Sequence, residues 1–184
     1  MLLNSGADVD NRDDSGRTPL FLACRSQHSH ISELIILTGA AIDARDRHGR
    51  TPLFLAASSG DRTSANLLLD KQADVNARDL QGRTPLMMAC FKGHFSVVQL
   101  LIKHGADLNA ETAEGHTATL CACASGRAEI VELLLDLGIH VNVANAKGFT
   151  PLLVASRARS TEVVQLLLSR GAELNPRKSE EFDY

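Results

Sequence analysis

The sequence predicts an all-helical repeat solenoid, a protein built from stacked pairs of helices. The first observation behind this prediction is a short motif, Gly-x-Thr-Pro-Leu, that recurs every 33 residues with no insertion or loss between copies. The second is an apolar stretch later in each copy that ends in a stop signal, in most copies glycine. A strict period of this length is typical of repeat architectures. The copies begin at residues 16, 49, 82, 115 and 148, and the fourth departs from the pattern.

Each residue of the motif has a mechanical role at the start of a helix. The glycine permits a tight turn with positive φ. The threonine side chain accepts a hydrogen bond from the free N–H groups of the first helical turn. Proline suits the first helical position, where its missing N–H costs nothing. We therefore expect the first helix of each pair to begin near the threonine and to end near residues 26, 59, 92, 125 and 158.

The second helix of each pair is predicted from apolar runs followed by a C-terminal stop. Leucine triplets at 67–69, 133–135 and 166–168 precede this stop. Apolar residues at i, i+3 and i+4 mark the face that packs against neighbouring helices. Two of these second helices are expected at 96–103 and 162–169.

The combined pattern resembles the ankyrin repeat over nearly the whole chain. It reads Asp-x-x-Gly-Arg-Thr-Pro-Leu-x-x-Ala, then an apolar helix, then Gly-Ala-Asp-Val-Asn. The resemblance implies an ankyrin-repeat array in which helix–turn–helix units are joined by β-hairpin-like fingers and stack into a curved solenoid. It also implies binding far more often than catalysis.

The repeat period divides the chain into five full units and two flanking pieces. Residues 1–12 resemble the end of a second helix, and the array is expected to begin inside a longer one. Residues 178–184 form a short charged tail that is predicted to be disordered. The full units are 13–45, 46–78, 79–111, 112–144 (irregular) and 145–177.

Composition argues against several classes of partner. The chain has 184 residues, of which 44% are hydrophobic, and a formal net charge of −3. This acidity argues against nucleic acid as a partner. No apolar run approaches the roughly 20 residues of a membrane helix, so we expect no membrane insertion. The absence of Trp and the single Tyr argue against an aromatic cage for methyl-lysine.

The four cysteines are expected to be buried thiols. Cys24, Cys90 and Cys123 share one position of the repeat. Neighbouring helices pack about 8–10 Å apart, whereas a disulfide needs Cα atoms within about 7 Å. Free thiols favour a reducing compartment, so we expect a cytoplasmic or nuclear protein. A zinc site is the weaker alternative, because the Cys-x-Cys at residues 121–123 lacks the usual ligand spacing. We expect no metal and no cofactor.

Three departures from the family pattern carry structural expectations. Where the family usually has histidine after Thr-Pro-Leu, this chain has apolar residues, which predicts apolar packing in every unit. Gln72 stands at a stop position where a left-handed backbone disfavours any residue but glycine. Thr119 replaces a buried leucine and loses apolar burial of about 1–3 kcal/mol. The apolar residues after Thr-Pro-Leu are Phe21, Phe54, Met87, Leu120 and Leu153.

The sequence gives no support for an enzyme. Asp13, Asp46 and Asp79 begin their units and are expected to bond turn N–H groups. His28 and His30 form the only close histidine pair and are interpreted as surface residues. No Gly-rich phosphate loop, Cys/His dyad or metal signature is present. We therefore predict a non-catalytic protein.

Binding is predicted on the concave face. The resemblance implies that finger tips and the ends of the first helices line this face, in positions that carry no consensus. Arg17, Arg50 and Arg83 form a ladder at about 10 Å steps, and arginine around an aromatic is typical of interface hot spots. The predicted partner-binding residues are Arg17, Arg47, His48, Arg50, Leu80, Arg83, Phe91, Lys92, His116, Phe149 and Arg157.

The predicted ligand is a protein segment, extended or helical, with acidic residues and one or two apolar anchors. Arg50, Arg83 and Lys92 would pair with the acids, and Phe91 and Leu80 would receive the anchor. An adaptor or scaffold is the favoured role. A regulatory or targeting domain of a larger enzyme or channel is the alternative. A purely structural role for the arginines, as ion pairs with aspartates of neighbouring units, is also open.

Overall fold

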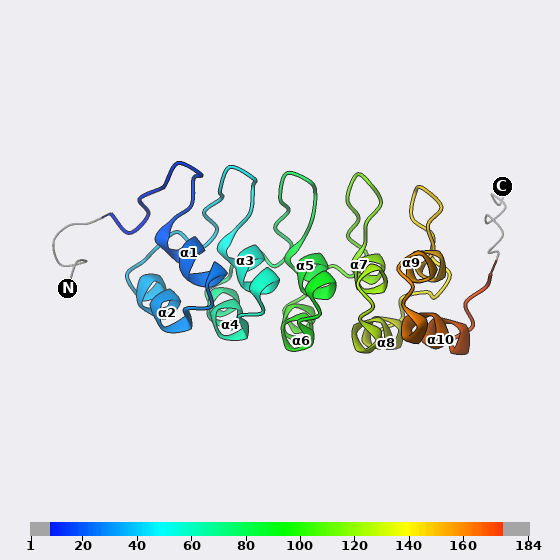
Figure 1. Ribbon diagram of the computed structural model, residues 1–184. Coiled ribbons are helices and arrows are strands. Elements are labelled where there is room, and N and C mark those ends of the chain that lie inside the picture. The colour runs from blue at the N-terminus through cyan, green and yellow to red at the C-terminus, as the bar shows by residue number, and fades with distance from the viewer. Residues whose placement is uncertain (1–7, 175–184) are drawn as a thin grey trace, which may run out of the picture.

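The computed structural model describes residues 8–174 as an elongated stack of helix pairs (Figure 1). The inner row of helices carries hairpin-shaped loops, the outer row lies beneath it, and α1 and α10 lie at opposite ends of the stack. Within residues 8–174 there are ten α-helices and no β-strand, so the all-helical solenoid is confirmed. The inner row is α1 (Pro19–Arg25), α3 (Pro52–Ser59), α5 (Pro85–Lys92), α7 (Ala118–Ala124) and α9 (Pro151–Arg157), and the outer row is α2 (Ser29–Leu37), α4 (Arg62–Asp70), α6 (Phe95–Lys103), α8 (Ala128–Asp136) and α10 (Thr161–Ser169).

The hairpin-shaped loops are here called fingers 1 to 5, after their turns at residues 13–17, 46–50, 79–83, 112–116 and 145–149. Each turn is closed by two backbone hydrogen bonds, as in finger 1, where Gly16 N donates to Asp13 O at 2.8 Å and Asp13 N donates to Arg17 O at 3.1 Å. The fingers are loops rather than strand pairs in the described part of the chain.

The threonine of the motif caps every inner helix, as its sequence position predicts. The Thr51 hydroxyl accepts a hydrogen bond from Phe54 N at 3.2 Å, and Pro52 occupies the first helical turn. Thr117 makes the same bond to Leu120 N at 3.2 Å although alanine replaces proline there. The cap therefore fixes the start of the inner helix even in the irregular fourth unit.

Within residues 8–174, three non-glycine residues have positive φ. Gln72 has φ of 65°, which confirms the left-handed backbone expected at this stop position. Gln27 and Arg159, at 57° and 56°, were not predicted. They follow α1 and α9 at the position that Gly60, with φ of 81°, occupies after α3. The positive φ at this position could have been predicted, because the same position is glycine in the three central units.

The core runs continuously between the two helix rows. Leu20, Leu53 and Leu86 are buried on the inner helices, and Thr119 is buried in the same position at 1% exposure. The prediction of apolar packing after Thr-Pro-Leu holds in four units and is wrong in the fifth, where Leu153 is 44% exposed. No inner helix of the described chain follows α9 to cover Leu153.

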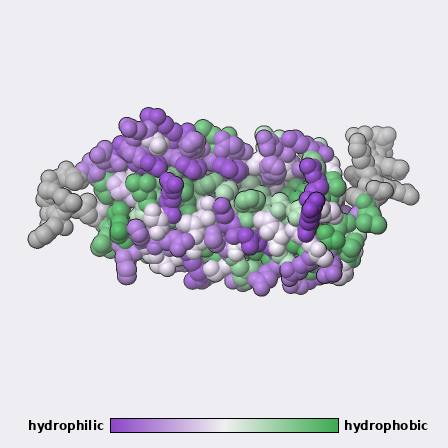
Figure 2. Space-filling model, in the orientation of Figure 1, coloured by the Kyte–Doolittle hydropathy of each residue, from purple (hydrophilic) through white to green (hydrophobic). Residues whose placement is uncertain are grey.

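Surface chemistry differs along the stack. Hydrophilic side chains gather over the N-terminal fingers, at the upper left of Figure 2.

Within residues 8–174 no helix has both the length and the apolar character needed to cross a bilayer. Residues 1–7 of the predicted N-terminal partial repeat and the predicted tail at 178–184 lie outside the described residues.

Candidate binding surface

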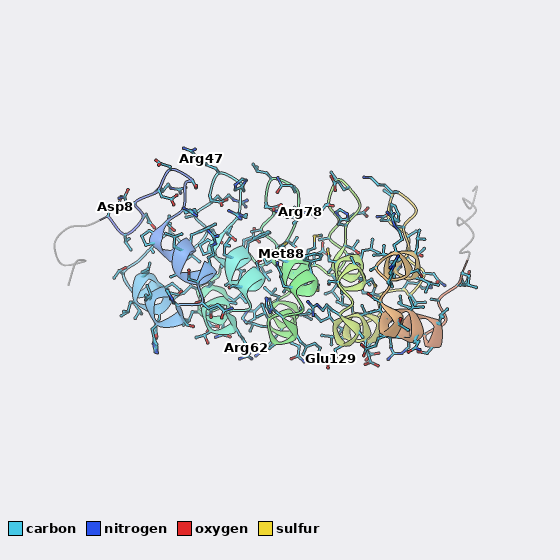
Figure 3. The ribbon with its side chains drawn as sticks, viewed as in Figure 1. Asp8, Arg47, Arg62, Arg78, Met88 and Glu129 are labelled. Atoms are coloured by element: carbon cyan, nitrogen blue, oxygen red, sulfur yellow. The ribbon has the colours of Figure 1, made fainter. Side chains whose placement is uncertain are left out.

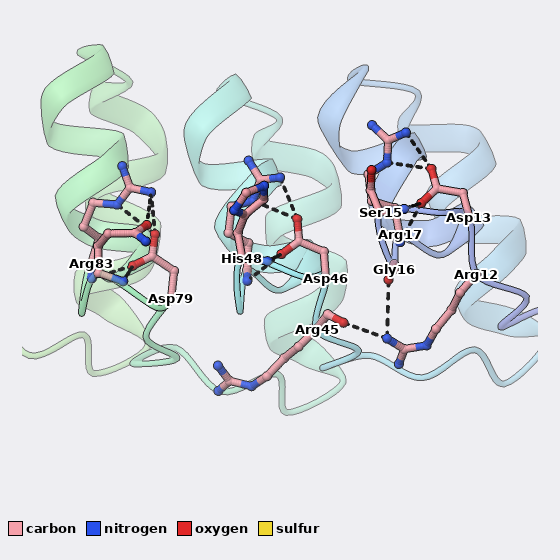
Figure 4. A network of polar contacts seen from close by, with 12 residues as sticks. Arg12, Asp13, Ser15, Gly16, Arg17, Arg45, Asp46, His48, Asp79 and Arg83 are labelled. Carbon is pink, nitrogen blue, oxygen red and sulfur yellow. Dashed lines mark hydrogen bonds and ion pairs between the residues drawn. The ribbon is translucent and has the colours of Figure 1, made fainter.

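An aspartate–arginine pair closes each of the first three fingers (Figure 4). In finger 2, the Asp46 carboxylate accepts hydrogen bonds from the backbone N–H groups of His48 and Arg50, both at 2.9 Å. The same carboxylate binds the Arg50 guanidinium, with Nη2 to Oδ2 at 2.6 Å. Finger 1 repeats this arrangement at Asp13–Arg17, and finger 3 repeats it at Asp79–Arg83, both at 2.5 Å.

These pairs lower the pKa of the carboxylates. Hydrogen bonds from the Arg17 side chain and backbone lower the pKa of Asp13 to about 2. Burial raises the pKa of Asp46, but the hydrogen bonds from Arg50 outweigh it, so the net pKa lies below the ordinary value. Both carboxylates are therefore charged at neutral pH.

The same arginines cover aromatic rings of the preceding unit. The Arg50 guanidinium lies 5.5 Å from the centre of the Phe21 ring, and that of Arg83 lies 5.7 Å from the Phe54 ring. A guanidinium over an aromatic face is an attractive contact. Each of the three arginines thus pairs with the aspartate of its own unit, and Arg50 and Arg83 also contact a phenylalanine of the preceding unit. The hypothesis of ion pairs between neighbouring units was wrong in that respect.

A second arginine column, which the sequence reasoning missed, joins one unit to the next. Arg12 Nη1 donates to Arg45 O at 2.7 Å, Arg45 Nη1 donates to Arg78 O at 2.7 Å, and Arg78 Nη1 donates to Glu111 O at 2.9 Å. Backbone bonds also join the first three fingers, from Arg47 N to Ser15 O at 3.0 Å and from Leu80 N to His48 O at 2.9 Å. The 33-residue recurrence of arginine was visible in the sequence.

Fingers 4 and 5 keep the turn but lack the aspartate–arginine pair. The Thr112 hydroxyl accepts from His116 N at 3.0 Å, and the Asn145 carbonyl accepts from Phe149 N at 2.9 Å. The two fingers are joined by Asn145, whose Nδ2 donates to Gly115 O at 2.7 Å. A side-chain oxygen therefore holds every turn, whereas the arginine is replaced by His116 and then by Phe149.

A groove opens where the arginine is replaced. It has a volume of about 590 Å³ and lies between fingers 3–5 and helices α5, α7 and α9. In Figure 3, Met88 lies at the level of the inner helices, whereas Arg47 lies at the outer edge of the fingers. The groove is lined by Arg83, Met87, Met88, Phe91, Glu114, His116, Leu120, Cys121, Ala124, Asn145, Lys147, Phe149, Val154, Arg157 and Ala158.

The groove brings together some of the predicted binding residues and not others. Leu80 is 71% exposed, but its side chain lies beside Gly49 of the preceding finger, away from the groove lining. Lys92 stands next to the groove, with Nζ 5.9 Å from the Phe91 ring. Arg83, Phe91, His116, Phe149 and Arg157 line the groove, and Arg17, Arg47, His48, Arg50, Leu80 and Lys92 do not.

Sequence reasoning missed the floor of the groove. Met88, Cys121 and Val154 share one position of the repeat, and each is half-buried. Met88 precedes Phe91 by three residues on α5, a spacing that places two side chains on one face of a helix. The predicted exposure of Phe91 could therefore have been used to predict that Met88 lies on the same face.

The thiols of this region are protonated at neutral pH. Burial raises the pKa of Cys121 to about 11 and that of Cys123 to about 12. All four cysteines are free. Within residues 8–174, no group of three or more His, Cys, Asp or Glu side chains is placed to hold a metal ion.

The stacked helix pairs define a repeat solenoid, and an open groove crosses three of its units. The sequence matches the model for ankyrin repeats (3 copies) over residues 1–79, 78–145 and 111–178. The chain therefore belongs to the ankyrin-repeat family. Ankyrin repeats generally serve as protein–protein interaction modules, and they are typically non-catalytic. No match was found among curated proteins.

Proposed function

We propose that this protein is a non-catalytic adaptor or scaffold whose groove over α5, α7 and α9 binds a segment of another protein. The segment presents an apolar anchor to the groove and acidic residues to its edges. The observation that carries this proposal is an apolar groove between fingers and inner helices, lined by the exposed Phe91 and the half-buried Phe149. Phe91, at its N-terminal wall, is 44% exposed, and the core is complete without it.

The apolar lining supports an anchor at this place. Phe91 and Met88 of the third unit, Cys121 of the fourth and Phe149 of the fifth all line the groove. Aromatic residues dominate interface hot spots, and methionine adapts to differently shaped partners. Exposed apolar groups gathered in one hollow are typical of interaction sites.

The charges at the groove support acidic flanks. Arg83 is already bound to Asp79 at 2.5 Å. In contrast, no carboxylate within residues 8–174 forms an ion pair with Lys92, Lys147 or Arg157. The Arg157 guanidinium rests 5.5 Å from the Phe149 ring. These three cations are available to a partner, whereas the paired Arg50 and Arg83 would first have to leave their aspartates.

The test is a pull-down from cell lysate with mass spectrometry, using the wild-type array and the double variant Phe91→Ala, Arg157→Glu. The control is Arg25→Glu, because Arg25 occupies the same repeat position as Arg157 but lies outside the groove. Circular dichroism verifies that each protein is folded.

We expect partners that bind to wild type and to Arg25→Glu but not to the groove variant. Partners retained by the groove variant and lost by Arg25→Glu would contradict the proposal and would move the binding surface to the first units. Partners retained by all three folded proteins would contradict it too, and would point to the outer helices.

A further inference from the structure

The side chains that line the groove are smallest in the fourth unit, where two repeat positions hold Ala124 and His116. On the inner helices, Ala124 stands between Phe91 and Arg157 in equivalent positions of successive units. On the fingers, His116 stands between Arg83 and Phe149 in the same way. All of these residues line the groove. The fourth unit therefore forms a pocket whose walls are the longer side chains of the third and fifth units.

The charge pattern around this pocket is ordered along the array. Lys92 lies on the side of the third unit, and Lys147 and Arg157 lie on the side of the fifth. Glu114, whose side chain is 72% exposed, lies at the centre, with its carboxylate 3.7 Å from His116 Nδ1. A like charge facing a partner's carboxylate costs binding energy and excludes the wrong sequence. The centre thus favours an uncharged apolar side chain, and only the two flanks favour acids.

Resting on the proposed function, we infer that the partner is an extended segment with one large apolar residue flanked on both sides by an acidic residue about three positions away. Adjacent units are separated by about 10 Å, and an extended chain advances about 3.3 Å per residue. The apolar side chain enters the pocket at Ala124. One acid meets Lys92, and the other meets Arg157.

An extended segment places the anchor and each acid about three positions apart, because about three residues cover one 10 Å step between units. In a helix, which rises about 1.5 Å per residue, the same 10 Å step would separate anchor and acid by about seven positions. The two cases therefore predict different spacings.

The first test is selection of a random 16-residue peptide phage library on the intact protein. We expect the enriched peptides to share an aromatic, leucine or methionine residue with Asp or Glu about three positions before and after it. Acids about seven positions from the anchor, or basic flanks, would overturn the inference. Selection of no peptide would overturn it too, because a segment of this length contains the whole motif. The pull-down partners test the proposed function separately from this result.

The second test fills the pocket. Ala124→Phe is expected to weaken binding of a selected peptide at least tenfold. Ser58→Phe, at the same repeat position in the second unit, should leave affinity unchanged. Unchanged affinity in folded Ala124→Phe would place the anchor elsewhere. If Phe91→Ala, Arg157→Glu still abolished binding, the groove would stand and only the pocket assignment would fail.

The third test exchanges charges. Arg157→Glu is expected to weaken a selected peptide at least tenfold, and a peptide with lysine in place of the acid on that side should recover most of the affinity for this variant. Lys103→Glu, on the exposed face of α6, serves as the control for net charge. Equal affinity of both peptides for the variant would overturn the assigned pairing.

Discussion

Fingers 1–3 and fingers 4–5 share one turn but use it differently. In the first three, an arginine four residues after the aspartate closes the turn, and in fingers 2 and 3 it also covers a ring of the preceding unit. In the last two, Thr112 and Asn145 hold the turn with a neutral oxygen, and the space left by the arginine becomes groove. The same column of the repeat therefore holds an ion pair in the first three units and lines the groove in the last two.

The largest expected effect comes from removing the carboxylate of finger 2. Asp46→Ala leaves two turn N–H groups and the Arg50 guanidinium without their acceptor. We expect a loss of about 3 kcal/mol in the free energy of unfolding, measured by urea denaturation. The matched Thr112→Ala removes one bond to a backbone N–H and should cost about 1 kcal/mol. Equal losses would show that the ion pair adds nothing to the first fingers.

Acid should weaken the first fingers before the last. The folded pKa values of Asp13 and Asp46 lie below the ordinary value of about 3.9. Their stabilisation is therefore present above about pH 4 and is lost as the pH falls towards the folded pKa, about 2 for Asp13. Urea midpoints measured from pH 5 to pH 2 should fall less steeply for Asp46→Asn than for wild type. Parallel curves would contradict this assignment.

Glycine at the left-handed stops should stabilise the array modestly. Gln72→Gly and Arg159→Gly each relieve a positive φ at a non-glycine residue, and we expect a gain of about 1 kcal/mol and a higher Tm for each. Gln27→Gly should gain less, because the Gln27 amide donates to Ser59 O. Lys71→Gly, where φ is −92°, is the control and should not gain. No rise for Gln72→Gly would contradict the strain assigned to that residue.

The smallest expected effect is a difference in alkylation rate between the cysteine of the groove and the cysteines of the core. Cys121 is half-buried in the groove lining with a pKa of about 11, whereas Cys24 and Cys123 are buried with values of about 12. Because the thiolate is the reactive form, alkylation by iodoacetamide should be slow at pH 7.5 and should accelerate as pH rises. Cys121 should react first, by mass spectrometry of digests. Faster labelling of Cys24 would contradict the exposure described for the groove.

The sequence predicted the scaffold well because local rules fix it. A threonine cap begins each inner helix, and the stop at Gln72 is left-handed as its place in the period required. Those features depend on residues within a few positions of one another. The positive φ of Gln27 and Arg159 followed the same rule and could have been predicted from the glycine at residue 60 and its equivalents.

The groove was harder to predict because it depends on positions where a long side chain is replaced by a shorter one. Phe91 was identified, but the pocket beside it exists because Ala124 and His116 are shorter than their neighbours. A repeat alignment names the residues of a face without saying which of them fill the space between fingers and helices. In the second unit, the Arg50 guanidinium is bound to the Asp46 carboxylate. Only the three-dimensional arrangement shows this ion pair.

The most direct test of the account is hydrogen exchange of the protein, measured by mass spectrometry, with and without a peptide selected from the library. We expect slower exchange at residues 83–92, 114–124 and 147–158 in the complex, and no change in fingers 1 and 2. Protection confined to fingers 1 and 2 would contradict it. That result would assign the binding surface to the arginine–aspartate pairs and would show that the groove takes no part in binding.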